Sequence, residues 1–111
     1  MIGFIILGVL IILILYVIFL YNADKYTEAI KCFEKGKEFN YFKKYDFEFE
    51  IGFTYYKLGD DDNAIKHYNE SLTNYGPSAT VFHNIGLCYS ELKKYQQAKS
   101  YFLLALSLDD E

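Results

Sequence analysis

The chain has 111 residues, enough for one small domain beside a short anchor, and carries a formal net charge of −4 at neutral pH. Its eleven basic residues are all Lys and form no basic stripe. Nucleic-acid binding depends on clustered Lys and Arg that neutralise phosphates, so we expect no nucleic-acid partner. Every charged side chain lies beyond residue 21, which divides the chain into an uncharged N-terminal segment and a mildly acidic remainder.

An unbroken apolar run, IGFIILGVLIILILYVIFLY, extends from Ile2 to Tyr21. A helix of roughly twenty residues is about 30 Å long, which matches the hydrocarbon thickness of a bilayer, and it satisfies its own backbone hydrogen bonds. Tyr16, Phe19 and Tyr21 gather at the end of the run, where aromatic rings favour the headgroup level. The sequence therefore predicts a single-pass membrane protein anchored by residues 1–22.

Two other interpretations of this segment remain. A helix buried in a soluble core needs apolar partners on all sides, and the remaining residues are too few to surround it. A cleaved leader would make the chain an exported envelope protein with a mature N-terminus near residue 24. No Lys or Arg precedes the run, however, its length exceeds the usual seven to fifteen residues or so, and no small-x-small cleavage site follows it.

Positive charge follows the apolar run. Lys25, Lys31, Lys35 and Lys37 lie within about twenty residues of its end, whereas only the amino terminus precedes it. Positive charge beside a membrane span favours the cytoplasmic side. We therefore expect the remainder, residues 23–111, to form a cytoplasmic domain.

That remainder contains an internal repeat of 34 residues. Ile51-Gly52-x-x-Tyr55-x-x-Leu58 aligns with Ile85-Gly86-x-x-Tyr89-x-x-Leu92, and Ala64, Tyr68 and Leu72 align with Ala98, Phe102 and Leu106. A third copy, Tyr26-x-x-Ala29-x-x-x-Phe33-x-x-Gly36, parallels Tyr95-x-x-Ala98-x-x-x-Phe102-x-x-Ala105. A fixed period of this length indicates a stack of helix pairs in which small residues allow close approach and aromatic residues fill the gaps.

This pattern resembles the tetratricopeptide repeat family over about residues 24 to 111. The third repeat matches best, with Phe82 at the leading aromatic position, followed by Ile85-Gly86, Tyr89, Tyr95, Ala98, Phe102 and Ala105. The second repeat departs from the pattern, because Glu48 stands at the leading aromatic position and Asp61 at the second Tyr. The resemblance implies an all-α solenoid of antiparallel helix pairs.

The fold expected is a membrane helix followed by about two and a half repeats. Residues 24–39 form the second helix of repeat one, 45–78 form repeat two, and 79–111 form repeat three. Gly59-Asp60 ends one helix and caps the next, and Gly76-Pro77 separates the later repeats. The expected helices are 2–22, 24–39, 44–58, 61–75, 78–92 and 94–108.

Repeat one lacks a separate first helix, and residues 16–21 occupy its place. The end of the membrane helix can therefore run directly into the repeats, pack on the helix from Asp24 and join the domain rigidly. A hinge at Asn22 is the alternative.

The last expected helix carries Leu103, Leu104, Leu106 and Leu108, and no capping helix follows to shield them. Exposed apolar patches of this kind mark interfaces. We expect either self-association through Leu103, Leu104 and Leu108, which makes a homo-oligomer, or a partner that covers this end. A natural chain that continues beyond Glu111 is the third alternative.

The chain offers little for catalysis. Cys32 and Cys88 fall on helices and are expected to be buried free thiols. His67 and His83 have no further metal ligand at suitable spacing, and Asp60 to Asp62 are more simply a helix cap than a calcium site. With no nucleophile, phosphate loop or paired acids, we expect no enzyme, no cofactor and no metal.

In the family, the first helix of each repeat lines a concave groove that holds an extended peptide or a partner helix. The resemblance implies a groove formed in repeat two by Asp46, Phe49, Glu50, Phe53, Tyr56 and Lys57, and in repeat three by Thr80, His83, Asn84, Leu87, Ser90 and Glu91. The family's clamp for acidic chaperone tails uses Lys, Arg and Asn, and only Asn84 matches it. The aromatic groove residues suit contact with an apolar anchor residue of a partner. Packing between neighbouring repeats is the alternative role for the same residues.

These observations predict a membrane-anchored scaffold or adaptor that binds a protein or peptide partner. A self-associating structural subunit and an exported envelope protein are the alternatives.

Overall fold

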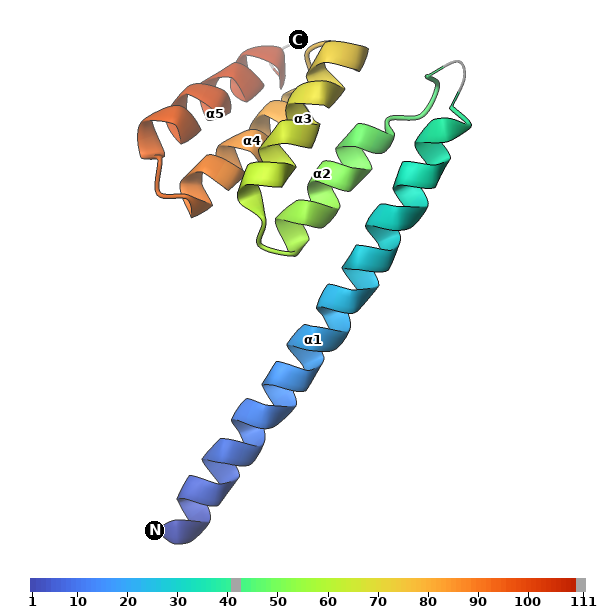
Figure 1. Cartoon of the computed structure of the whole chain (residues 1–111). Coiled ribbons are helices and arrows are strands. Elements are labelled where there is room, and N and C mark those ends of the chain that lie inside the picture. The colour runs from blue at the N-terminus through green and yellow to red at the C-terminus, as the bar shows by residue number, and fades with distance from the viewer. Residues whose placement is uncertain (41–42, 110–111) are drawn as a thin grey trace.

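The computed structural model describes residues 1–40 and 43–109, and within them it contains helices and no strand. The helices are α1 (Ile2–Glu38), α2 (Phe47–Lys57), α3 (Asp61–Tyr75), α4 (Ala79–Glu91) and α5 (Tyr95–Asp109). Helix α2 lies beside the C-terminal half of α1, and α3, α4 and α5 follow in turn on the far side of α2, whereas the N-terminal half of α1 extends far beyond them (Figure 1). The predicted all-α architecture is confirmed.

Helix α1 is continuous over 37 residues, so the two helices expected at 2–22 and 24–39 are one. The residues around Asn22 include no Gly or Pro, and nothing there interrupts the backbone hydrogen bonds. The expectation that the apolar helix runs directly into the repeats is confirmed, whereas its packing on the helix from Asp24 is wrong, because each segment continues the other along one axis. The structure has no hinge at Asn22, and an uninterrupted helix joins the two parts.

The later helices begin at side-chain caps. Asp46 accepts a hydrogen bond from the backbone N–H of Phe49, Asp60 from that of Asn63, and Ser78 from that of Val81. These bonds satisfy N–H groups that a helix leaves unpaired at its start. Capping at Asp60 confirms the predicted role of the acidic run, and the other helix ends lie within three residues of their predicted positions.

In each helix pair, an aromatic ring of one helix packs against a glycine of the other. A Cβ at Gly52 would lie 2.9 Å from Cδ1 of Tyr68, and a Cβ at Gly86 would lie 2.6 Å from Cε1 of Phe102. The same contact joins α1 to α2, where a Cβ at Gly36 would lie 2.6 Å from Cε1 of Phe47. Since a Cβ at these distances would force the aromatic ring to move, glycine permits the close approach.

The core lies between α3 and α4. Tyr68, Ile85 and Cys88 are fully buried there, together with Ala64 of α3 and Val81 of α4. Burial of Cys88 agrees with the prediction, whereas Cys32 is exposed, contrary to it. Cys32 lies on α1, which buries no residue, and among the described helices α2 alone contacts α1.

The apolar half of α1 is not buried by any other part of the chain that the structure describes. Every large apolar side chain from Ile2 to Tyr21 is at least 44% exposed, and the span contributes nothing to the core. The alternative of a helix buried in this chain's own core is therefore wrong. The segment is long and apolar enough to cross a bilayer.

Candidate partner-binding surface

The exposed face of α2 carries an aromatic row that ends in a cation. Phe49 and Phe53 lie one helical turn apart with ring centroids 6.5 Å apart and nearly parallel, and the Nζ atom of Lys57 lies 5.2 Å from the centroid of Phe53. Phe49 is half-buried, and its ring also contacts Tyr68 at 5.8 Å, whereas Phe53 is 39% exposed. The row is thus anchored in the core at Phe49 and open to solvent at Phe53.

Helix α4 supplies the neighbouring wall. The side-chain amide of Asn84 donates to the hydroxyl of Tyr68 over 3.4 Å, which brings it near the Phe49 ring that Tyr68 also touches. Tyr56 packs on the core with only part of its ring exposed, and Leu87 is also half-buried. The structure therefore brings together Phe49, Phe53, Lys57 and Asn84 of the predicted groove.

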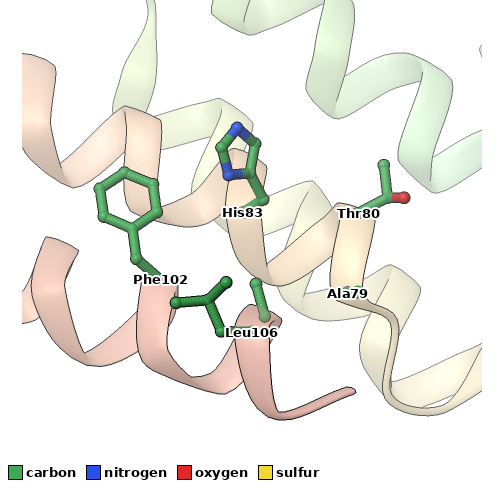
Figure 2. Close-up of a pocket in the computed structure, with 6 residues that line it drawn as sticks. Ala79, Thr80, His83, Phe102 and Leu106 are labelled. Atoms are coloured by element: carbon green, nitrogen blue, oxygen red, sulfur yellow. The ribbon is translucent and has the colours of Figure 1, made fainter. Parts of the chain in front are cut away.

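Two hollows flank the start of α4. One, of about 400 Å³, includes Asp46, Phe49 and Ser71 in its lining, and the other, of about 650 Å³, lies between α4 and α5. Thr80 lines both. Figure 2 shows the larger hollow, with Thr80 and His83 on α4 and Phe102 and Leu106 on α5.

His83 belongs to the larger hollow and is directed toward α5. Its ring centroid lies 5.4 Å from that of Phe102. Sequence reasoning placed His83 in the groove with the residues of α2, and it missed Phe102, Ala105 and Leu106 as parts of a binding surface. The sequence did offer a signal for these residues, because the last helix carries apolar residues, Leu106 among them, that no following helix covers.

A charged cluster lies where α1, α2 and α3 meet. Glu48 is 4% exposed; one of its carboxylate oxygens pairs with Nζ of Lys37, and the other lies 2.7 Å from Nδ1 of His67. Burial of Glu48 alone would raise its pKa, but the hydrogen bonds from His67 and Lys37 outweigh burial and hold that pKa below its usual value. Burial would also lower the pKa of Lys37, but the bond to Glu48 raises it. This cluster ties α1 to the repeats.

The signal for this cluster was the departure of Glu48 from the family pattern. An aromatic residue at that position would fill space, whereas Glu48 supplies a buried charge that needs partners. Lys37 and His67 are remote from it in the sequence, so only the packing of the helices reveals them.

His67 also has potential metal ligands in space, contrary to the sequence expectation. Single ligand atoms of Glu48, His67 and Glu70 lie within 4.8 Å of one another, because α2 and α3 pair and Glu70 follows His67 by one helical turn. Lys37 already pairs with Glu48, however, and its positive charge disfavours a cation. We interpret the group as a structural ion-pair network.

Cys88 is unsuited to nucleophilic chemistry. Burial, followed by the neighbouring carboxylate of Asp61, raises the pKa of its thiol to about 12. The thiolate that would attack a substrate is therefore scarce at neutral pH.

The fold and this surface define an α-solenoid of stacked helix pairs, a class that presents helical faces to other molecules. The chain belongs to the tetratricopeptide repeat family, whose sequence model matches residues 48–111. Repeats of this family generally mediate interactions between proteins. The chain is also 34% identical over 56 residues to intraflagellar transport protein 70A of Danio rerio. That match covers 50% of this chain and 9% of the relative, so the chain spans a small part of that protein's length.

Proposed function

We propose that this protein is a single-pass membrane adaptor. Residues 1–22 anchor it, and residues 23–111 hold the repeats on the cytoplasmic side, with repeat two at 45–78 and repeat three at 79–111. The exposed apolar half of α1 supports the anchor, since lipid is the solvent that suits a helix apolar on every side. The lysines that follow it support the orientation.

The repeats then lie close to the membrane surface. Phe19, Asn22 and Tyr26 of α1 line a small hollow together with Lys57 and Leu58 at the end of α2. If the bilayer ends near Tyr21, the turn between α2 and α3 lies at the headgroup level. Because α1 is continuous, partner binding on the repeats is held at a fixed height and angle above the membrane.

The partner is a protein with an apolar anchor residue. The exposed Phe53, supported from below by Phe49 and flanked by Lys57, carries this proposal. An apolar side chain that packs on Phe53 is removed from water, and an acidic group beside it can pair with Lys57. Aromatic residues with rigid support are typical of the centres of protein interfaces.

A photo-crosslinking amino acid at position 56, next to the row, tests partner binding in cells of the source organism. We expect a discrete crosslinked protein that is lost in Phe53→Ala. Phe39→Ala is the matched control, because Phe39 is 72% exposed but lies at the end of α1, away from the row. Equal crosslinking in both variants would contradict the proposed site.

The cleaved-leader alternative is tested separately. The mass of the protein recovered from membranes should equal that of the full chain. A mature N-terminus near residue 24 would overturn the anchor while leaving the binding surface intact.

A further inference from the structure

The larger hollow is the face on which a further repeat would stack. Shifted by 34 residues, its residues Phe102, Ala105 and Leu106 correspond to Tyr68, Ser71 and Leu72 of α3. In that earlier pair, α4 covers the face: Tyr68 and Ser71 are 0% and 2% exposed, and Val81 and Ile85 of α4 share their core. At the later pair, Leu106 remains 59% exposed (Figure 2).

The exposed leucines of α5 lie on two different faces. At 100° per residue, Leu103 and Leu106 lie about 60° apart and share a stripe with Lys99 and Phe102. Leu104 lies about 160° from Leu106, on the other side of the helix. Only the stripe with Leu103 and Leu106 borders the hollow, since Phe102 and Leu106 line it.

The charge of α5 suits contact with a second copy of itself. From Tyr95 to Leu108 the sole charged residue is Lys99, although the whole chain carries −4. A patch that meets its own copy across a two-fold axis must avoid repulsion between like charges, and a nearly neutral helix does so. A strongly charged partner helix would find almost no opposite charge here.

The position of this charge also favours one direction. Lys99 lies in the first half of α5. A parallel crossing would place Lys99 of one copy beside Lys99 of the other. An antiparallel crossing centred between Leu103 and Leu106 keeps these two like charges apart.

We propose that two copies of the chain dimerise through α5, antiparallel, with Leu103 of each copy packed into the hollow between α4 and α5 of the other. The contact repeats the stacking that joins α3 to α4, because a second copy would cover α5 as α4 covers α3. It goes beyond the proposed adaptor function, because it uses a different face from the Phe49 and Phe53 row and requires no other protein.

The test is the mass of the full chain, purified in a mild detergent, by sedimentation equilibrium over a hundredfold range of concentration. We expect a dimer for the unmodified chain and for Leu104→Glu. Leu106→Glu should weaken the dimer at least about tenfold, since each copy then buries a charge in an apolar contact. Leu103→Glu should do the same without altering the lining of the hollow, which guards against a folding defect in Leu106→Glu.

Two results would overturn the proposal: a monomer for the unmodified chain at every concentration, or dimers that persist in both Leu106→Glu and Leu103→Glu. The second result would assign association to α1 or another face. Orientation is tested by thiol oxidation of Lys99→Cys combined with Cys32→Ser. We expect no disulfide between copies, because an antiparallel crossing keeps the two positions apart, and efficient disulfide formation would contradict the antiparallel arrangement.

Discussion

Phe49 and Phe53 differ in burial although they belong to one aromatic row. Phe49 packs on the core cluster and Tyr68, whereas Phe53 contacts Phe49 and Lys57 and is 39% exposed. The sequence left both residues divided between core packing and ligand contact. Their contacts assign Phe49 mainly to the core and leave Phe53 available to a partner.

We predict that truncating Phe49 mainly lowers stability, whereas truncating Phe53 mainly lowers partner binding. Phe49→Ala should lower the free energy of unfolding by about 2 kcal/mol, because a half-buried ring leaves a partial cavity. Phe53→Ala should change it by less than about 0.5 kcal/mol and instead reduce partner crosslinking. Denaturant titration followed by near-ultraviolet circular dichroism of the tyrosines measures the first effect, and equal destabilisation by both variants would refute the assignment.

Glu48 is the residue whose replacement most directly probes the join between α1 and the repeats. Glu48→Gln should lower the free energy of unfolding by about 1–2 kcal/mol, since a nearly buried bond to a charged group is lost. Glu34→Gln is the control. It removes the other partner of Lys37, a solvent-exposed carboxylate 3.5 Å away, and should cost less than about 0.5 kcal/mol.

Glu48 should also make the free energy of unfolding depend on pH. Because the pKa of Glu48 in the folded protein lies below its usual value of 4.5, its ionised form stabilises the fold above that pH. This stabilisation is lost as the pH falls from 4.5 toward the lowered folded pKa. Glu48→Gln should flatten this part of the curve of unfolding free energy against pH, and an unchanged slope would show that Glu48 does not couple to folding.

At the scale of helices, two equivalent glycines should respond differently to substitution. A Cβ at Gly52 would meet the fully buried Tyr68 and also the backbone oxygen of Ala64 at 3.2 Å, so neither neighbour can yield. A Cβ at Gly86 would meet Phe102, which borders the open hollow and can move into it.

Gly52→Ala should therefore lower the free energy of unfolding by about 1–3 kcal/mol. Gly86→Ala should cost less than about 1 kcal/mol, because the helix propensity of Ala offsets a contact that can relax. Gly8→Ala, which meets nothing within 4 Å, serves as the neutral reference. Equal losses at Gly52 and Gly86 in denaturant titrations would contradict this difference in packing.

The helix pairs could be predicted because the residues that form them recur at a fixed spacing. Gly52 with Tyr68 and Gly86 with Phe102 repeat after 34 residues, so the sequence reveals both contacts at once. The continuity of α1 could not be predicted in this way. The family pattern suggests two helices per repeat, whereas local backbone chemistry around Asn22 contains no residue that ends a helix.

Contacts between residues that belong to no repeated motif were harder to predict from the sequence. Lys37, Glu48 and His67 belong to three helices and form no motif, so their meeting follows only from the packed arrangement. The exposure of Cys32 likewise depends on which side of α1 meets α2. Of the predicted groove, Phe49, Phe53, Lys57 and Asn84 come together, while His83 lies beside α5.

At the scale of the whole molecule, one continuous helix joins an exposed apolar segment to a small helical-repeat domain. The long axis of the molecule measures 59 Å, and the apolar half of α1 projects from the repeats along the helix (Figure 1). Anchoring in a bilayer would remove the large exposed apolar surface from water. The repeats would then present their Phe53 row and the α5 face beside the membrane.

Protease accessibility of a C-terminal tag, compared between intact and permeabilised cells of the source organism, tests this account most directly. We predict a tag that sediments with membranes and is cleaved only after permeabilisation, as expected for repeats held on the cytoplasmic side by α1. Cleavage of the tag in intact cells, or its recovery in the soluble fraction, would contradict the proposed orientation or the anchor.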